Sequence, residues 1–125
     1  MNGEELFLEH NGLLIGSPEY NGSITGALKN LIDWMTRKNA NSEPLDCFKN
    51  KTAAILSGSP GNLGGIRALP HLSEILMSIG VTMHPNRLAI PHATQKINEI
   101  DNHPELLKTL DLLGYNLSKS IQERL

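Results

Sequence analysis

Two short stretches of the chain carry polar groups in an arrangement that suits ligand binding. The first reads GSPEYNGSITG at residues 16–26, and Pro18 stiffens it because the proline ring fixes φ and restrains the residue before it. Glu19, Tyr20 and Asn21 follow with a carboxylate, an aromatic ring and an amide. A stiff loop with exposed backbone N–H groups loses little conformational entropy on binding, so it suits a flat ligand with polar edges.

The second stretch is rich in glycine and reads SGSPGNLGG at residues 57–65. Glycine has no Cβ atom, so a ligand can approach such a backbone closely. Gly64 and Gly65 open a helix whose N-terminus favours an anion or an electronegative carbonyl oxygen. No Gly-Lys-Ser/Thr sequence follows, so this is not a Walker loop, and the stretch is not the dinucleotide fingerprint either. Taken alone, each stretch is also compatible with an ordinary connecting turn.

Short apolar runs alternate with amphipathic segments along the chain, and this alternation predicts one parallel α/β sheet. Strands are expected at 13–15, 52–56 and 81–90, the last broken by Pro85. The first run is continuous, as expected for a strand buried on both faces. Helices are expected at 4–10, at 25–38, from the glycine-rich stretch to Ile79 with Pro70 near its start, and from about residue 102 onward with Pro104 in the first turn.

These elements fit a single domain spanning residues 1–125. Parallel sheets bind their ligands outside the carboxyl ends of the strands. The loops that leave Ile15, Leu56 and Ile90 are therefore the expected binding segments, and the first two are the stretches described above. Residues 99–105 are expected to form a polar loop without a further role.

Composition excludes several classes of protein. The 125 residues carry a formal net charge of −2 and only 4% are aromatic, which argues against nucleic-acid binding. No apolar run is long enough to cross a membrane, and the polar, acidic first residues differ from a secretory signal, so a cytoplasmic protein is expected. The one cysteine, Cys47, is expected to pack as a small hydrophobic residue, and neither it nor the five histidines have the spacing of a metal site.

The two stretches and the segments that follow them, GSPEYNGSITGALKNLIDW and SGSPGNLGGIRALPHLSEIL, resemble the NAD(P)H-dependent FMN reductase family. The resemblance extends from about Glu4 to the last helix. It implies a flavodoxin-like three-layer α/β/α fold and an activity as a flavin, quinone or chromate reductase. The implied reaction passes a hydride from NADPH or NADH to bound FMN and electrons on to a small-molecule acceptor, with no side chain acting as a catalytic acid or base.

The resemblance also implies roles for individual residues. The first stretch would border the isoalloxazine ring of FMN, largely through backbone groups, and the second would approach the ring from its other edge. The residues expected at the cofactor are Pro18, Glu19, Tyr20, Asn21, Ser23, Ser57, Gly58, Gly64 and Gly65. Tyr20 and Arg67 match positions near subunit contacts, which implies a homo-oligomer, either a dimer or a tetramer.

Local chemistry predicts two ionic contacts. Arg67 stands in the first turn of an expected helix, where the helix dipole disfavours a cation, so we expect a carboxylate partner such as Glu19 or a residue of another subunit. Lys29 and Asp33 have the i, i+4 spacing of a solvated pair on a helix surface. Trp34, which flanks the apolar face of the same helix, is expected in the core or in an interface.

Members of the family begin with a strand, a phosphate-binding loop containing Ser and Arg, a helix and a second strand, and this sequence has no G-S-x-R-x-x-S pattern. The fold is therefore expected to be N-terminally incomplete, with strand 13–15 as an apolar sheet edge open to pairing. Three hypotheses follow. The protein is an FMN reductase whose N-terminal part is supplied elsewhere or was lost, a non-enzymatic oligomer-forming remnant that binds no flavin, or a shortened flavoprotein that rebuilds the phosphate site across a dimer.

Overall fold

Three parallel strands form one sheet in the computed structural model, which describes residues 3–125. The strands are β1 (Gly12–Gly16), β2 (Thr52–Gly58) and β3 (Thr82–Ile90), and they lie in the order β1-β2-β3. Each predicted apolar run forms one of these strands. Successive strands pair in parallel, with Leu14 opposite Ala54 and Leu56 opposite Leu88. The predicted parallel α/β fold is confirmed.

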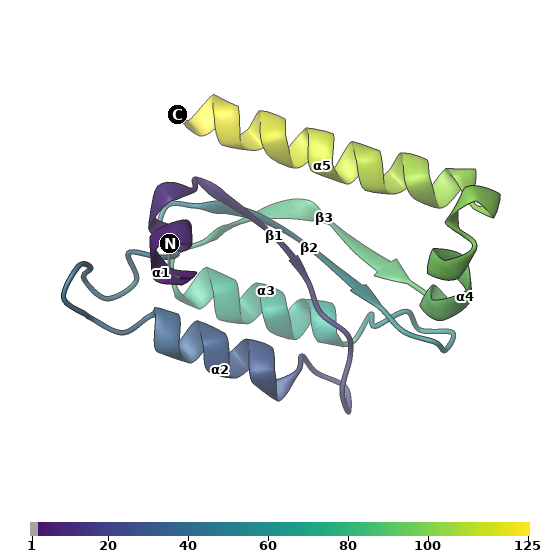
Figure 1. Ribbon diagram of the computed structural model, residues 1–125, viewed down its shortest axis with the longest axis horizontal. Coiled ribbons are helices and arrows are strands. Elements are labelled where there is room, and N and C mark those ends of the chain that lie inside the picture. Colours follow the sequence, from purple (N-terminus) through teal and green to yellow (C-terminus); the bar gives the residue numbers. More distant parts are fainter. Residues whose placement is uncertain (1–2) are drawn as a thin grey trace.

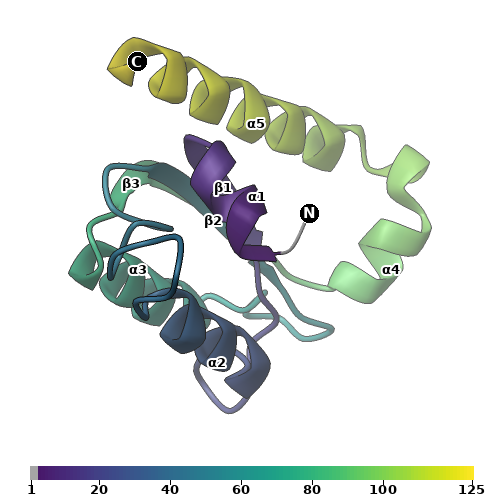
Figure 2. The same ribbon diagram turned by 60° about the vertical axis from the view of Figure 1, so that its left-hand side comes forward.

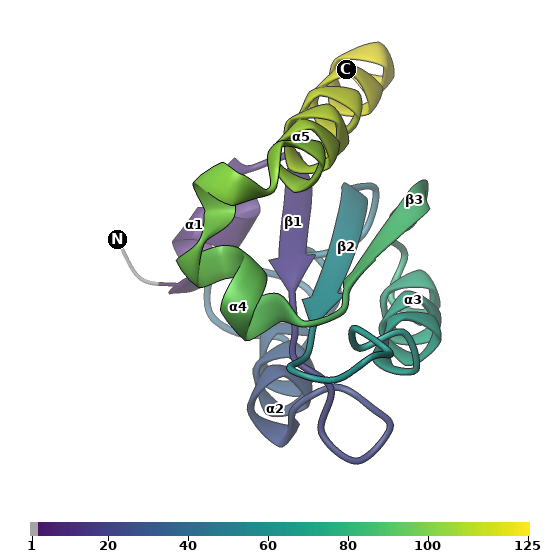
Figure 3. The same ribbon diagram turned by 90° about the vertical axis from the view of Figure 1, so that its right-hand side faces the viewer.

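Helices cover both faces of the sheet and give the three layers that the sequence predicts (Figure 1). In Figure 3, which is turned by 90° from Figure 1, α2 and α3 again lie on one side of the sheet and α5 on the other. The helices are α1 (Gly3–Glu9), α2 (Gly26–Met35), α3 (Ala68–Ser78), α4 (Ala93–Asn98) and α5 (Pro104–Arg124), with a 3-10 turn, η1, at Ile100–Asn102. Among the described residues, none of these helices has the length and apolarity that a bilayer crossing requires.

Strand β2 is the centre of the fold because its side chains alternate between two cores. Ala53 and Ile55 point into the larger core, which α2 and α3 close with residues such as Ile32 and Leu72. Ala54 points into the smaller core under α5, with Leu113 and Leu117. This period of two is what a strand with helices on both faces requires.

The prediction that strand 13–15 is buried on both faces is wrong for one residue. Leu13 and Ile15 pack against the larger core, but Leu14 is 55% exposed. Its face of the sheet is covered only by α5 among the described helices, and the buried residues of α5 pack on Ala54 of β2. Within residues 3–125, β1 is an edge strand, as the family resemblance implied.

Pro85 does not break the third strand, contrary to the sequence prediction. Strand β3 runs continuously past it, and the pairing register shifts so that Ala53 faces Met83 while Ile55 faces Arg87. Three residues of β3 therefore lie opposite Ala54 alone. A proline has no N–H to donate, so edge strands and bulges are where sheets accommodate it, and β3 provides both.

Helix α4 and the turn η1 were not predicted, and residues 99–105 are not the simple polar loop expected. The six residues of α4 read ATQKIN and have no apolar periodicity to reveal a helix. The helix forms where the chain turns after β3, beyond the carboxyl ends of the strands (Figure 2). Its first residue, Ala93, is buried and donates its backbone N–H to the Ser59 carbonyl at 2.8 Å.

Helix α1 is held to the sheet by a buried lysine. Lys51 directly precedes β2 and is 6% exposed, and its Nζ donates to the carbonyl oxygens of Phe7 and His10 at the end of α1. Burial lowers the pKa of Lys51. Phe7 also packs on Phe48, with ring centroids 5.3 Å apart. Cys47, in the same core, is buried as predicted, and burial raises the pKa of its thiol.

Candidate cofactor site

The loops that follow β1 and β2 meet at the carboxyl ends of these neighbouring strands. The first loop comprises residues 17–25 and the second comprises residues 59–67. Ser17 donates its backbone N–H to the Leu56 carbonyl at 3.1 Å, and the buried Ser57 hydroxyl donates to the Ser17 carbonyl at 2.6 Å. The two sequence stretches therefore start from one hydrogen-bonded base.

The first loop contains a tight two-residue turn. Tyr20 and Ser23 exchange backbone hydrogen bonds, with N···O distances of 2.9 and 3.2 Å. The residues between them, Asn21 and Gly22, have φ angles of 55° and 84°. Positive φ at both central positions is the geometry for which Asn-Gly is the favoured sequence. The turn adds a second source of stiffness to that of Pro18.

The Glu19 carboxylate joins the first loop to the start of α3. It accepts three hydrogen bonds from Arg67: at 2.9 Å from the backbone N–H, at 2.9 Å from Nε and at 2.5 Å from Nη2. The Glu19 side chain is only 8% exposed, and that of Arg67 is 60% exposed. The guanidinium and the backbone N–H of Arg67 hold the pKa of Glu19 below its usual value. The predicted carboxylate partner of Arg67 is thus Glu19 of the same chain.

A second side-chain contact joins the same two elements one helical turn further on. His71 Nδ1 lies 2.8 Å from Ser23 Oγ. Both contacts link residues that are 48 positions apart, so the first loop runs alongside the first turn of α3. From the sequence, the histidines were considered only as metal ligands, and this contact was missed. The available signal was the i, i+4 spacing of His71 from Arg67, which places the two on one helix face.

The glycines of the second loop make room for the protein's own backbone. A Cβ on Gly65 would lie 1.9 Å from Ser57 Oγ, and one on Gly64 would lie 2.5 Å from the backbone nitrogen of Pro91. Both glycines have positive φ angles, of 64° for Gly64 and 83° for Gly65. The second loop is therefore folded tightly onto the ends of β2 and β3. Contact of Ser57, Gly64 and Gly65 with FMN stays a prediction beside these internal roles.

The loop after β3 completes this end of the molecule. His92 has a left-handed backbone conformation, with φ of 52°, and donates its N–H to the Gly61 carbonyl at 3.0 Å. Ser59 also donates its N–H to the Ile90 carbonyl at 3.2 Å. The second loop is thus hydrogen-bonded to the loop after β3 and joined to the first loop through Arg67, at the end of the sheet where parallel α/β proteins bind ligands.

Several groups at this end remain available to a ligand. Within residues 3–125, the backbone N–H groups of Glu19 and Asn21 donate no hydrogen bond to another part of the chain. Tyr20 is 61% exposed. A Cβ built on Gly22 or Gly61 would meet no atom within 4 Å, so the backbone is open at both positions. These features lie on the first loop and the middle of the second.

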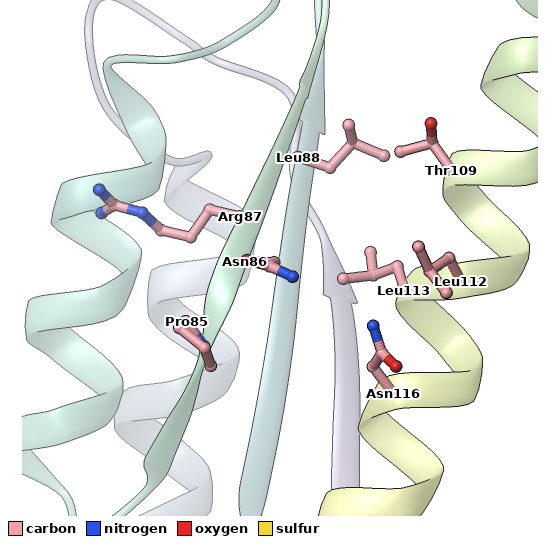
Figure 4. A pocket seen from close by; sticks show the side chains of 8 residues that line it. All are labelled: Pro85, Asn86, Arg87, Leu88, Thr109, Leu112, Leu113 and Asn116. Atoms are coloured by element: carbon pink, nitrogen blue, oxygen red, sulfur yellow. The ribbon is translucent and has the colours of Figure 1, made fainter.

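A hollow of about 470 Å³ lies elsewhere, between β3 and α5. In Figure 4, Asn86 and Leu88 of β3 face Thr109, Leu113 and Asn116 of α5 across this groove, whereas Arg87 points to the opposite face of the strand. None of the residues predicted to contact FMN lines this groove. The candidate site is therefore defined by backbone geometry and available donors rather than by this hollow.

A three-layer fold with sequential parallel strands, and with polar loops joined at their carboxyl ends, defines a flavodoxin-like α/β protein. The family model described as NADPH-dependent FMN reductase matches residues 3–95. The chain belongs to this family.

Similar proteins carry matching names. The chain is 44% identical over 75 residues to an NAD(P)H-dependent FMN reductase of Pseudomonas aeruginosa, a match that covers 60% of this chain and 37% of that protein. It is 40% identical over 73 residues to a quinone reductase of Escherichia coli, covering 58% and 36% respectively. The chain thus spans little more than a third of the length of these relatives.

One solved structure also resembles the chain in both fold and sequence. It is a flavoenzyme NAD(P)H:acceptor oxidoreductase from Paracoccus denitrificans, with a TM-score of 0.59 and 32% identity. The match covers 67% of this chain and 45% of that chain.

Proposed function

We propose that the protein is an FMN reductase-type oxidoreductase. It would use NADPH or NADH as the electron donor and a quinone, a flavin or a similar small molecule as the acceptor. Family membership over residues 3–95 supports this function, because the match includes both loops of the candidate site. The names of the similar proteins from Pseudomonas aeruginosa and Escherichia coli support the same reaction class.

The observation that carries the proposal is the joint between the two loops. The Ser57 hydroxyl donates to the Ser17 carbonyl, and the Glu19 carboxylate binds Arg67. These contacts give the polar loops of two adjacent strands fixed positions side by side. A planar ligand with polar edges needs donors held in this way on more than one edge.

The described residues fit the ring of FMN in two respects. The amide N–H groups of Glu19 and Asn21 are free to donate to ring carbonyl oxygens or nitrogens, and the open backbone at Gly22 and Gly61 lets a ring approach. Bound FMN would supply the redox chemistry, which is to take up the hydride and pass electrons on to the acceptor. The chain's own part is to bind and orient the ring, and no side chain of the loops needs to hold or move a proton.

A second candidate function is that of a non-enzymatic, oligomer-forming domain without flavin. It is favoured by the exposed apolar surface, since Leu14 on the edge strand is 55% exposed and Trp34 on α2 is 62% exposed. Both candidates include a homo-oligomer, which we propose on the same observation. Only the first candidate predicts a bound flavin.

An FMN titration of the purified chain, with NADPH oxidation followed in the same sample, separates the candidates. The first predicts saturable quenching of FMN fluorescence and oxidation of NADPH that depends on the protein. Retention of FMN by this chain alone would favour a phosphate site rebuilt across subunits. A chain that leaves FMN fluorescence unchanged at every protein concentration would contradict flavin binding by this chain alone, and would support the flavin-free domain or a reductase whose N-terminal part is supplied elsewhere.

A further inference from the structure

The tip of the first loop depends on few contacts for its position. Tyr20 is 61% exposed, and the Tyr20–Ser23 turn is closed by only two backbone hydrogen bonds. A two-residue hairpin of this size is not stable in water without further support. Ile24 packs into the core at the end of the loop, but it follows the turn. Other contacts must hold the turn itself.

Two contacts with α3 provide that support, one on each side of the turn. Glu19 precedes the turn and binds Arg67 through both carboxylate oxygens. Ser23 closes the turn and binds His71. Arg67 and His71 lie four positions apart, on one face of the helix start. The turn is therefore held at both ends by a single rigid element.

The chemistry of the first contact explains why an acidic residue stands in this loop. The Arg67 backbone N–H lies at the start of α3, where helix N–H groups lack intrahelical acceptors and favour an anion. The Glu19 carboxylate fills that role and is neutralised by the Arg67 guanidinium as well. Its charge is thus committed to the helix.

We propose that Glu19–Arg67 and Ser23–His71 form a two-point clamp that holds the first loop in its binding conformation. These four are positioning residues, and their side chains act through the backbone of residues 19–22. The part of the inference that concerns FMN rests on the proposed function. It adds a role for the side chains of Glu19 and Ser23, which would hold the loop on α3, to the backbone contacts that the family resemblance implies for this loop.

The clamp predicts a linked change in loop order and in affinity. A ligand that binds only the ordered loop has an apparent Kd equal to its intrinsic Kd divided by the ordered fraction. Loss of one clamp contact that lowers this fraction about tenfold therefore raises the apparent Kd of FMN about tenfold. The same loss raises the amide exchange rates of the turn, where Tyr20 and Ser23 donate their N–H groups across the hairpin.

Amide hydrogen exchange and FMN titration of Arg67→Met and Ser23→Ala test the clamp. Arg67→Met removes the guanidinium and keeps the backbone N–H, and Arg67→Lys is its conservative partner, which we expect to restore part of the protection. Lys38→Met is the matched control, because it removes an exposed cation paired with Glu43 away from the loop. Exchange within α3 serves as the internal reference for folding.

We expect the Tyr20 and Ser23 amides to lose nearly all of their protection in both clamp variants, together with a rise of about tenfold in the Kd of FMN, and we expect no change in α3 or in Lys38→Met. Unchanged exchange at the turn in both variants would remove the clamp. A near-complete loss of protection at the turn with an unchanged Kd would remove its role in positioning FMN. A wild-type chain that binds no FMN would instead remove the part of the inference that concerns FMN, which the exchange data alone do not test.

Discussion

Glu19 places a negative charge in a loop that we propose to receive an electron-accepting ring, and its pairing with Arg67 resolves that conflict. The carboxylate is 8% exposed and accepts three hydrogen bonds from one residue. Its charge is balanced before any ligand arrives. The acidic side chain meets what α3 needs at its start, and the helix dipole at Arg67 is the signal in the sequence that indicates this need.

The pH dependence of stability tests this pairing. The pKa of Glu19 is lowered from 4.5 in the folded chain, so the folded state favours the carboxylate. Its stabilising contribution is fully present above pH 4.5 and is lost as the pH falls through the lowered folded-state pKa. We expect wild type to be more stable than Glu19→Gln at neutral pH, with the difference shrinking in acid. Urea unfolding of both proteins across the acid range measures the difference in their free energies of unfolding. A difference that does not change with pH would contradict the pairing.

Asn21 tests the electrostatics of the proposed ring site directly. Its φ of 55° is one that Asp also tolerates, so Asn21→Asp changes charge more than backbone. We expect the Kd of FMN to rise by up to about fivefold, because the new carboxylate would face the partial negative charge on the carbonyl oxygens of the ring, and even two full like charges 4 Å apart in water repel by only about 1 kcal/mol. Asn21→Gly keeps the positive φ without a charge and is the control. Equal FMN affinity in Asn21→Asp and Asn21→Gly would count against a ring beside this residue.

At the scale of elements, α2 shows how the site is fixed to the fold. Thr25 closes the first loop and caps α2, because its hydroxyl oxygen accepts the Leu28 N–H at 3.0 Å. The helix then buries Ile32 in the larger core. One residue thus ends the loop and starts the helix that anchors it.

Removal of that cap has a defined cost. Thr25→Ala leaves the Leu28 N–H without its acceptor, and we expect the free energy of unfolding to fall by about 1 kcal/mol. Thr25→Ser keeps a hydroxyl at the same place, so we expect only a small part of that fall in the free energy of unfolding. Thermal and urea unfolding of the three proteins measure the difference. Identical midpoints for Thr25→Ala and wild type would show that the cap contributes nothing.

The elements differ in how far the sequence predicts them. The three strands and the helices α1, α2, α3 and α5 follow from apolar periodicity, which is set by burial along each segment. Helix α4 does not, because tertiary contacts such as that of Ala93 with Ser59 hold it. Pro85 predicted a break, but a bulge on an edge strand accommodates it.

The features of the candidate site also differ in how far the sequence predicts them. The local sequence indicates a stiff first loop and a glycine-rich second loop, and helix electrostatics indicated a partner for Arg67. The contact of Ser23 with His71 joins positions 48 apart, and no local pattern encodes that distance. The glycines were predicted to let a ligand approach the backbone. At Gly65 the missing Cβ leaves room for the Ser57 side chain, because tight packing of the loop on its strand also requires a residue without a Cβ.

At the scale of the whole molecule, the described chain presents apolar surface on two sides. Leu14 lies on the edge strand β1, and Leu31 and Trp34 are exposed on α2 with Arg37 stacked 4.9 Å from the Trp34 ring. An edge strand offers unpaired backbone groups as well as side chains, so it is the more favourable surface for another chain. We therefore predict a homo-oligomer that uses β1.

Size-exclusion chromatography with light scattering measures the mass of that assembly. We expect a dimer or tetramer at micromolar concentration, and we expect Leu14→Lys to shift the mass toward the monomer because a charge on the edge strand opposes pairing. Trp34→Lys places the same charge on α2 and serves as the matched comparison. A wild-type monomer would contradict the oligomer. If only Trp34→Lys lowered the mass, the interface would lie on the helical face and not at the sheet edge. A phosphate site rebuilt across subunits would then have no partner chain beside β1.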